Sequence, residues 1–328
     1  MSKGKCVGLL GAVILLGAVV IGCGSDSSDG ETGTLNLSIT DAPVDGAAAV
    51  WVTFTGVHLQ SVDGSGDQGP YAIPTDRQLI NLMEYTGTDS AALITDMEVS
   101  AGTYKLRLDA DLSFAEDTQS SWIAFDDSSD RCETLPEGAV WSDDRETCRY
   151  PLTIPSGDRS GFKPKGEIRI AAGGTSSFTA EFDLRKNIVD PSNPNDIVFK
   201  LKPTGLRLVD NSAVGSIAGD VTLVGECVPE RARVYLYDLT DFAGVFGADD
   251  MHDGNGWFLT SALVRTITVE GAVSYAYRIG FVPAGTDYAL ALTCDDMDDP
   301  EVDEVDFPFE VQVTQISVVA NQETTQDL

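Results

Sequence analysis

The sequence predicts an all-β protein in which two β-sandwich domains follow an N-terminal export leader. Short segments of alternating apolar and polar residues recur along residues 33–328, which is the period-2 pattern of half-buried strands. Helical periodicity is nearly absent from the same region. The first 22 residues combine a charged start with an apolar run, and their removal leaves 306 residues, a length that suggests two domains.

The leader has Lys3 and Lys5 before an apolar run over residues 7–21, which is shorter than the roughly 20 apolar residues of a membrane span. Cys23, at the point where the run breaks, resembles the lipobox cysteine of bacterial lipoproteins. In that family residues 1–22 would be removed and Cys23 would become the acylated first residue. The alternative is a plain secretory leader with an incidental cysteine.

The Gly/Ser/Asp-rich residues that follow predict a lipidated flexible tether over residues 23–32. Gly24 and Ser25, and no Asp directly after Cys23, fit the sorting pattern of lipoproteins bound for the outer membrane. The resemblance therefore implies an exported protein, lipid-anchored to the bacterial outer membrane and facing the periplasm or the cell surface.

The chain is strongly acidic, with 21 Lys and Arg residues against 52 Asp and Glu residues and a net charge of −31. Such a charge repels phosphate backbones, so nucleic-acid binding is disfavoured. The membrane is expected as a partner only through the lipid, and no cofactor is expected apart from Ca²⁺.

Four cysteines remain beyond Cys6 of the leader and the anchor Cys23, and in an exported protein an even number predicts disulfides. Three pairings are possible. Because the chain divides near residue 211, the local pairs Cys132–Cys148 and Cys227–Cys294 are the simplest. A zinc site is the alternative, but neither Cys-x-x-Cys nor paired histidines occur.

The first domain is predicted over residues 33–210. A stop at Pro43 ends its first strand, because proline cannot donate to a ladder. The segment 91–97 reads as one helical turn. Strand patterns occupy residues 34–40, 50–59, 102–108, 168–170, 177–184 and 197–208.

A polar insertion, residues 109–150, interrupts this pattern and has few periodic stretches beyond 122–125. A loop this long is expected to be functional or to need a staple. The Cys132–Cys148 pair would supply about 3 kcal/mol in the chain-entropy account of disulfides.

Several motifs of this domain resemble a family of bacterial lipoproteins whose N-terminal domain is a domain of unknown function. They are Thr40-Asp41-Ala42-Pro43-Val44-Asp45, Val52-Thr53-Phe54-Thr55-Gly56-Val57, Ala101-Gly102-Thr103-Tyr104, Phe182-Asp183-Leu184-Arg185-Lys186 and Leu201-Lys202-Pro203. The resemblance covers about residues 33–210 and implies an exported β-sandwich without a known activity.

Two interpretations of these motifs remain open. In the structural one, Phe182 and Leu184 face the core while Asp183 and Arg185 face out. In the functional one, Asp41, Asp45 and Asp183 gather as a cation site, because buried carboxylates need a counter-charge.

The second domain is predicted over residues 211–328, after an inter-domain linker at residues 211–215. Residues 280–290 resemble the Pro-Ala-Gly-Thr-Tyr turn of carboxypeptidase-regulatory-like, transthyretin-type modules, with Asp287 inserted before the tyrosine. The likeness implies an immunoglobulin- or transthyretin-like sandwich. Its strands are expected at residues 216–221, 232–237, 263–269, 274–281, 288–292, 307–313 and 316–319.

Acidic loops of the second domain are candidate calcium sites, with solvated turns as the alternative. In the first domain, residues 63–67 copy the start of an EF-hand loop, but Gln68 replaces its glycine and the match fails. The candidate ligands are Asp249, Asp250, Asp253, Asn255, Asp295 and Asp296.

The tryptophans are candidate contacts for a sugar or a partner protein. Trp122, Trp141 and Trp257 lie in or beside expected loops, whereas Trp51 is expected in the core.

No Gly-x-Ser-x-Gly, His-Glu-x-x-His or phosphate-loop motif occurs, and His58 in mid-strand reads as a surface residue rather than a base. The sequence therefore predicts a non-enzymatic envelope module that binds or organises a glycan or an envelope protein. Carbohydrate binding by the C-terminal sandwich, a calcium-dependent adhesion module and a hydrolase with two carboxylates are the alternatives.

Overall fold

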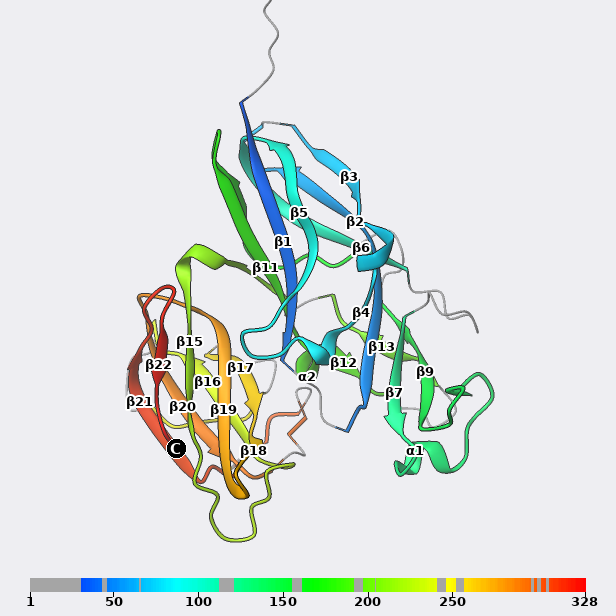
Figure 1. Cartoon of the computed structure of the whole chain (residues 1–328), viewed down its shortest axis with the longest axis vertical. Helices are drawn as coiled ribbons and strands as arrows, with labels where there is room; N and C mark the ends of the chain where they lie inside the picture. Colours follow the sequence, from blue (N-terminus) through cyan, green and yellow to red (C-terminus); the bar gives the residue numbers. More distant parts are fainter. Residues whose placement is uncertain are drawn as a thin grey trace, which may run out of the picture. The chain divides into compact units, whose positions relative to one another are not determined.

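The computed structural model describes residues 31–42, 46–64, 66–111, 121–154, 161–191, 197–203, 205–240, 246–251, 257–295, 298–299, 302–304 and 307–328. The leader, Cys23 and all of the tether before residue 31 lie outside the described residues. Residues 31–328 form one compact unit, in which strands dominate as the alternation predicts (Figure 1). None of its described helices has the length and apolar character needed to span a bilayer.

Two sheets make up the N-terminal sandwich. The smaller one has the order β14 (Arg207–Asp210), β11 (Thr175–Asp183), β1 (Thr32–Ala42), β5 (Ala91–Ser100), with β1 and β11 parallel. The larger one runs β10 (Ile168–Ile170), β6 (Gly102–Asp111), β2 (Ala49–Ser61), β7 (Trp122–Asp126), β9 (Thr147–Thr153), β13 (Phe199–Leu201), β12 (Ile188–Val189). Short strands at its side are β3 (Gln68–Ala72) and β4 (Leu79–Asn81), both on β2, and β8 (Val140–Trp141) on β9.

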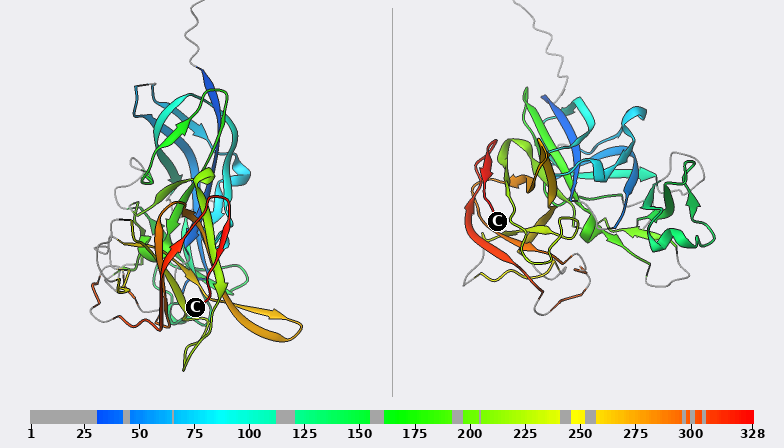
Figure 2. Two further views of the ribbon diagram at one scale, coloured as in Figure 1. Left: turned by 90° about the vertical axis from the view of Figure 1, so that its left-hand side faces the viewer. Right: turned by 60° about the horizontal axis from the view of Figure 1, so that its bottom comes forward.

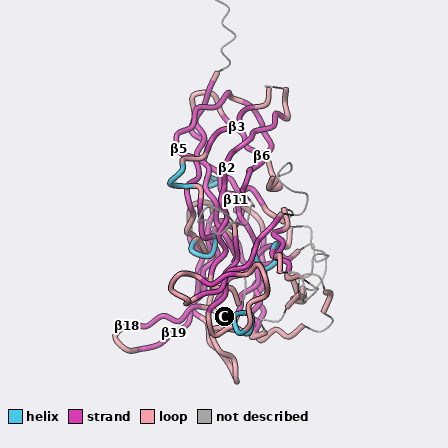
Figure 3. The backbone as a smooth tube through the Cα atoms, turned by 90° about the vertical axis from the view of Figure 1, so that its right-hand side faces the viewer, coloured by secondary structure: helices cyan, strands magenta, loops and turns pink. Residues whose placement is uncertain are grey.

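The C-terminal sandwich has two four-stranded sheets. One has the order β18 (Arg265–Val269), β19 (Ala272–Pro283), β15 (Val214–Asp220), β22 (Glu323–Thr325). The other has the order β17 (Phe258–Leu263), β16 (Arg233–Asp238), β20 (Asp287–Thr293), β21 (Val311–Ser317). The β18–β19 hairpin stands out from the rest of this sandwich (Figures 2 and 3), and every residue of β18 is exposed.

Helical segments are short and lie between strands. They are η1 (Thr75–Arg77), η2 (Leu82–Glu84), α1 (Asp130–Glu133), α2 (Leu184–Asn187) and η3 (Asn211–Ala213).

Each sandwich has its own apolar core. In β2, Val50, Val52 and Phe54 are fully buried in the N-terminal core, as their alternation predicts. In the C-terminal sandwich Val234 and Leu236 of β16 point into the space between its sheets. Burial of such side chains contributes about 25 cal/mol per Å² of apolar surface, so these cores are the main stabilising feature of both sandwiches.

A third apolar cluster covers the opposite face of β16, where Tyr235 and Tyr237 pack against Phe258 and Phe307. Residues 246–251 and 307–309 supply the rest of this cover. Strand β16 is therefore buried on both faces, which the alternation in its sequence does not reveal.

Two local expectations are wrong. Residues 91–97 belong to strand β5 rather than to a helical turn, because β1 pairs with them along its length. The described part of 109–150 is mostly ordered within the larger sheet as β7, β8 and β9, and Phe125 lies in the core. Residues 211–215, which connect β14 to the C-terminal sandwich, form η3 and the start of β15, and the Asp210 carboxylate caps η3 by accepting from the Ser212 amide.

Candidate functional site at the junction of the sandwiches

Strand β11 leads into the junction through the Phe182–Lys186 motif, whose last residues form α2. The Asp183 carboxylate caps α2 by accepting from the Lys186 amide, and the Asn187 side chain accepts from the Asp183 amide at 3.0 Å. The Leu184 amide donates to the Asp41 carboxylate at 3.2 Å. Two of the motifs singled out in the sequence therefore meet here, because β1 and β11 are parallel neighbours in register.

Arg185 extends from α2 into the C-terminal sandwich. Its guanidinium donates to the Tyr235 hydroxyl at 2.8 Å and lies over the Tyr235 ring. The same hydroxyl donates to the Asp298 carboxylate at 2.6 Å, and the Met251 amide donates to that carboxylate at 3.0 Å. The Lys186 ammonium lies 4.1 Å from the centre of the Phe258 ring.

The expectation that Asp183 and Arg185 face solvent is therefore wrong, since only 5% and 4% of their surfaces are exposed. Burial along β11 does not alternate beyond Phe178, since every residue from Phe178 to Asp183 is buried, and after Asp183 the chain turns into α2. Arg185 then lies against the covered face of β16 instead of continuing the strand pattern.

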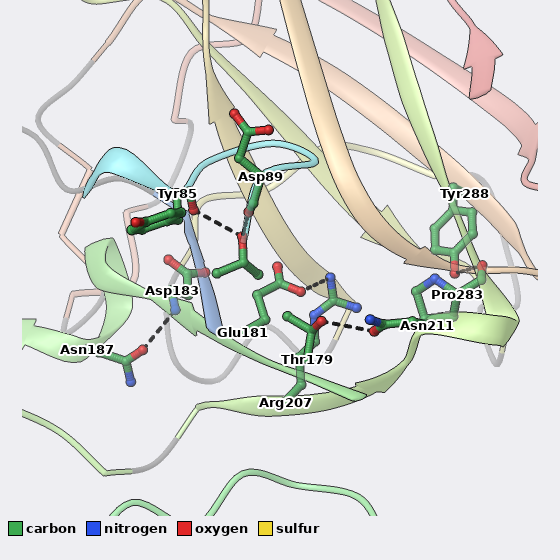
Figure 4. Close-up of polar contacts among 11 residues, drawn as sticks. Tyr85, Asp89, Thr179, Glu181, Asp183, Asn187, Arg207, Asn211, Pro283 and Tyr288 are labelled. Carbon is green, nitrogen blue, oxygen red and sulfur yellow. Dashed lines mark hydrogen bonds and ion pairs between the residues drawn. The ribbon is translucent and has the colours of Figure 1, made fainter. Parts of the chain in front are cut away.

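A buried ion pair joins the neighbouring strands β11 and β14 beside α2. Glu181 of β11 stands opposite Arg207 of β14, and the two side chains form a salt bridge (Figure 4). Behind it, the Thr179 hydroxyl donates to the Asn211 side chain at 2.9 Å. Removing these two charges from water costs free energy, and their mutual attraction offsets that cost.

Burial sets the protonation of this network. It raises the pKa of the Glu181 carboxyl above its ordinary value, although Arg207 opposes the shift. It also raises the pKa of the Asp183 carboxyl, against the lowering effect of Lys186 and Arg185. The pKa values of Tyr235 and Asp298 are raised for the same reason.

The loop after β4 closes one side of the junction. The Thr40 hydroxyl lies within hydrogen-bond distance of the carbonyl oxygens of Tyr85, at 3.0 Å, and Asp89, at 2.7 Å (Figure 4). The Arg265 guanidinium donates to the Thr86 hydroxyl from the C-terminal sandwich. Gly280 comes so close to this loop that a Cβ atom there would lie 2.0 Å from the Gly87 carbonyl oxygen.

A cavity of about 500 Å³ opens between the sandwiches beside these contacts. Its lining mixes hydroxyl groups, carboxylates and two guanidinium groups, with little aromatic surface. The polar side chains are Thr40, Asp41, Thr86, Thr88, Asp89, Glu181, Asp220, Thr260, Ser261, Arg265, Tyr277, Arg278, Glu323, Thr325 and Asp327. This volume and this density of hydrogen-bonding groups suit a small polar ligand.

The structure contains both disulfides that the spacing favours. Cys132 is bonded to Cys148, and Cys227 to Cys294, with Cα–Cα distances of 5.6 and 5.4 Å. The first lies in the N-terminal core and joins α1, which contains Cys132, to β9, which contains Cys148. Disulfides are typical of exported proteins.

The candidate calcium ligands are only partly described. Asp253, Asn255 and Asp296 lie outside the described residues. The Asp250 carboxylate accepts from the Glu304 amide, and the Asp249 carbonyl oxygen accepts from the Tyr237 hydroxyl. Among the described residues no three acidic, histidine or cysteine side chains are grouped to hold a metal ion, so the calcium site stays a prediction.

The cation site expected from Asp41, Asp45 and Asp183 also stays a prediction. Asp41 and Asp183 are brought together, but Asp45 lies outside the described residues. His58, expected at the surface, is half-buried, with its ring 2.5 Å from the Asp109 carboxylate.

The three candidate tryptophans have different surroundings. Trp257 is 45% exposed. Trp141 is half-buried against the N-terminal core. Trp122 is buried, stacked on Trp51 and covered by Arg149, so it offers no open face to a sugar.

Sequence reasoning missed most of the junction network: Glu181, Arg207, Tyr235 and Asp298. Glu181 and Arg207 are charged residues inside strands, where they read as outward-facing positions. The sequence feature that could have indicated Glu181 is its position directly before the Phe182–Lys186 motif.

Comparisons with known proteins support one assignment. The family model described as "Domain of unknown function (DUF4382)" matches residues 32–203, just over half of the chain. No curated protein matches the chain significantly.

Solved structures give weak likenesses. The Bacillus anthracis TIE protein is 11% identical over 91% of this chain, with a TM-score of 0.17; the chain spans only 34% of that protein. The major pilin of Streptococcus pyogenes is 9% identical, covering 92% of this chain and 100% of the pilin, with a TM-score of 0.15. A candidate cell adhesion protein from Bacteroides fragilis is 10% identical, covering 90% and 92%, with a TM-score of 0.19.

TM-scores this low do not establish a shared fold. The family match has a different standing, because it spans the N-terminal sandwich and contains the Asp41 and Asp183 motifs that meet at the junction. The chain therefore belongs to the family defined by this domain of unknown function, DUF4382.

Proposed function

We propose that the chain is an exported, non-catalytic binding module, anchored to the bacterial outer membrane through a lipid on Cys23, with its ligand held in the junction cavity. One observation carries the proposal. The cavity of about 500 Å³ is lined by strands of both sandwiches, beside a buried network that links them. A site built this way is pre-formed, which lowers the entropy that binding costs.

The chemistry of the lining supports binding rather than catalysis. Acyl transfer needs a nucleophile beside a base, and among the described residues the four cysteines are in disulfides. His58 is engaged by Asp109 and Arg107 in the N-terminal sandwich, and it does not line the junction cavity. The buried Glu181 carboxylate is neutralised by Arg207 rather than free to take a proton from a substrate.

Neutral carbohydrate is the ligand class that the lining favours. Closely spaced hydroxyl, carboxylate and guanidinium groups can donate to and accept from several sugar hydroxyls at once. A second candidate is a sugar site on the C-terminal sandwich around Trp257, favoured by the exposure of that side chain.

Saccharide binding is tested by calorimetry on the full chain, with a panel of neutral mono- and oligosaccharides. Arg278→Gln removes a guanidinium group from the cavity and should weaken binding by about tenfold, the loss typical of one charged hydrogen bond. Arg231→Gln is the matched control, because both arginines are about half exposed and paired with a carboxylate. Trp257→Ala reports on the second candidate site.

Absence of saccharide binding would reject the carbohydrate assignment. Turnover in a broad hydrolase screen that Arg278→Gln abolishes and Arg231→Gln preserves would reject the non-catalytic assignment.

The anchor is tested by metabolic labelling with a radioactive fatty acid. Cys23→Ser should abolish the label and release the protein from the membrane fraction. Cys6→Ser, within the leader, should leave both unchanged. Equal labelling of the two variants would contradict the anchor.

A further inference from the structure

A second cavity, of about 690 Å³, opens on the outer face of the N-terminal sandwich. Four of the chain's 21 Lys and Arg residues line it: Lys105, Arg107, Lys163 and Lys165. His58 lines it as well, whereas Asp67 is its one acidic lining residue. The chain as a whole has a net charge of −31, so the charge around this cavity is opposite in sign to that of the whole chain.

Strand pairing explains why two of these cations converge. In the β2–β6 register His58 stands opposite Arg107, and Gln60 stands opposite Lys105. The residues between them, such as Leu59 and Leu106, are buried in the core. Alternation therefore places the four polar side chains together on the outer face.

A separate segment supplies the other two lysines. Phe162 exchanges backbone hydrogen bonds of 2.8 and 2.9 Å with Leu108 of β6, and Lys165 exchanges two of 2.8 Å with Leu206 and Leu208, which hold the segment 162–165 in place. Phe162 and Pro164 are buried, whereas Lys163 and Lys165 are exposed. Gly161 permits the approach, because its φ is +54° and a Cβ there would lie 2.4 Å from the Leu108 carbonyl oxygen.

The charges of the cavity are only partly balanced within the protein. Arg107 lies 3.1 Å from the Asp109 carboxylate, and His58 lies 2.5 Å from it. In the part of the chain that the structure describes, Lys105, Lys163 and Lys165 form no ion pair. Three ammonium groups are thus left facing one cavity, although the chain has 52 carboxylate side chains to pair with them.

We propose that this cavity binds a small ligand through a phosphate or sulfate group. Three ammonium groups, one on β6 and two on the segment 162–165, suit a tetrahedral oxyanion, whose several oxygens accept from several donors at once. A lone carboxylate would be matched by a single guanidinium fork, and Arg107 already has such a partner. Gln60 on the cavity wall can hydrogen-bond the rest of the ligand.

Charge and size restrict the ligand further. The net charge of −31 repels extended polyanions at distances up to the Debye length, about 8 Å at physiological ionic strength. The volume lies in the range of about 300–1,000 Å³ that holds small molecules. The ligand is therefore a phosphorylated or sulfated small molecule rather than a nucleic acid.

The proposal is tested by calorimetric titration of the full-length protein, in non-ionic detergent and a phosphate-free buffer, with inorganic phosphate and with sulfate. A third titration with dihexanoylphosphatidylglycerol, a soluble lipid, distinguishes a lipid headgroup from a free oxyanion. The K105Q/K163Q double variant should lose at least about tenfold in affinity for whichever probe binds, because two of the three unpaired ammonium groups are removed.

Lys200→Gln is the control for losing a lysine charge outside the cavity, with half the charge change of the double variant, since Lys200 is an exposed lysine on β13 that does not line the cavity. It should change the affinity by less than about twofold. A thermal melt of each variant establishes that it is folded. No heat with any of the three probes up to about 10 mM, or equal losses in K105Q/K163Q and K200Q, would overturn the proposal.

Discussion

The Arg185 guanidinium donates to the Tyr235 hydroxyl at 2.8 Å, and this hydrogen bond joins the two sandwiches. Arg185 lies within the residues that match the family domain, whereas Tyr235 lies on β16 of the C-terminal sandwich. The Tyr235 hydroxyl in turn donates a hydrogen bond to the Asp298 carboxylate. The segment Phe182–Lys186 is therefore part of the interface with the second sandwich as well as of its own domain.

Removing the Tyr235 hydroxyl should weaken this junction. Tyr235→Phe leaves the Asp298 carboxylate without one of its donors in a buried place, so the free energy of unfolding should fall by about 1–3 kcal/mol. Arg185→Met should cost about 3–5 kcal/mol, because it removes a buried charge from its partners. Urea denaturation measures both.

The double variant shows whether the two side chains act together. A double-mutant cycle should give a coupling energy of about 0.5–3 kcal/mol for Arg185 and Tyr235. Strict additivity of the two losses would mean that the hydrogen bond does not contribute to stability.

Glu181 should make stability depend on pH. Burial raises its pKa above the ordinary value of 4.5, so the folded state binds this proton more tightly than the unfolded state. The free energy of unfolding should therefore fall as pH rises from about 4.5 through the folded pKa, by about 1.4 kcal/mol for each pKa unit of the shift.

Glu181→Gln cannot titrate, and its decline over this range should be shallower than that of the wild type. Part of the decline should persist, because burial also raises the pKa values of Asp183 and Asp298. Glu98→Gln, at an exposed position on β5, should keep the full decline. Urea denaturation from pH 4.5 to 8 measures it, and parallel profiles for wild type and Glu181→Gln would refute the assignment.

The two disulfides should differ in their contribution. Cys227–Cys294 spans 67 positions and Cys132–Cys148 spans 16, so the chain-entropy account predicts losses of about 4 and about 3 kcal/mol respectively. Paired Cys→Ala variants, unfolded in guanidinium chloride, measure each loss. A larger loss for Cys132–Cys148 would show that burial of its sulfur atoms in the core outweighs loop length.

Gly280 should tolerate no side chain. Gly280→Ala places a Cβ against the Gly87 backbone, which cannot move aside without shifting the loop of the other sandwich. The expected loss is about 1–3 kcal/mol, the range for overpacking. Gly247→Ala is the matched control, because a Cβ there meets nothing within 4 Å, and its thermal unfolding should be close to that of the wild type.

Local sequence patterns predicted the strands well where one face of a strand is buried and the other is exposed. Leu35, Leu37 and Ile39 alternate as expected and are fully buried. The pattern failed where a strand is covered on both faces or where pairing overrides it. Residues 91–97 became a strand because β1 offers them a full ladder, a long-range partner that a local window does not contain.

The sequence by itself determined the all-β class and the positions of most strands, because alternation is a local property, and it favoured the cysteine pairs that the structure contains. Only the tertiary structure decided that Arg185 is buried against Tyr235 and that Glu181 is paired with Arg207. It alone brought Lys105 and Lys163 to one cavity. The physical reason is that a residue's position along a strand fixes which face it lies on, whereas the residues that cover that face come from distant parts of the chain.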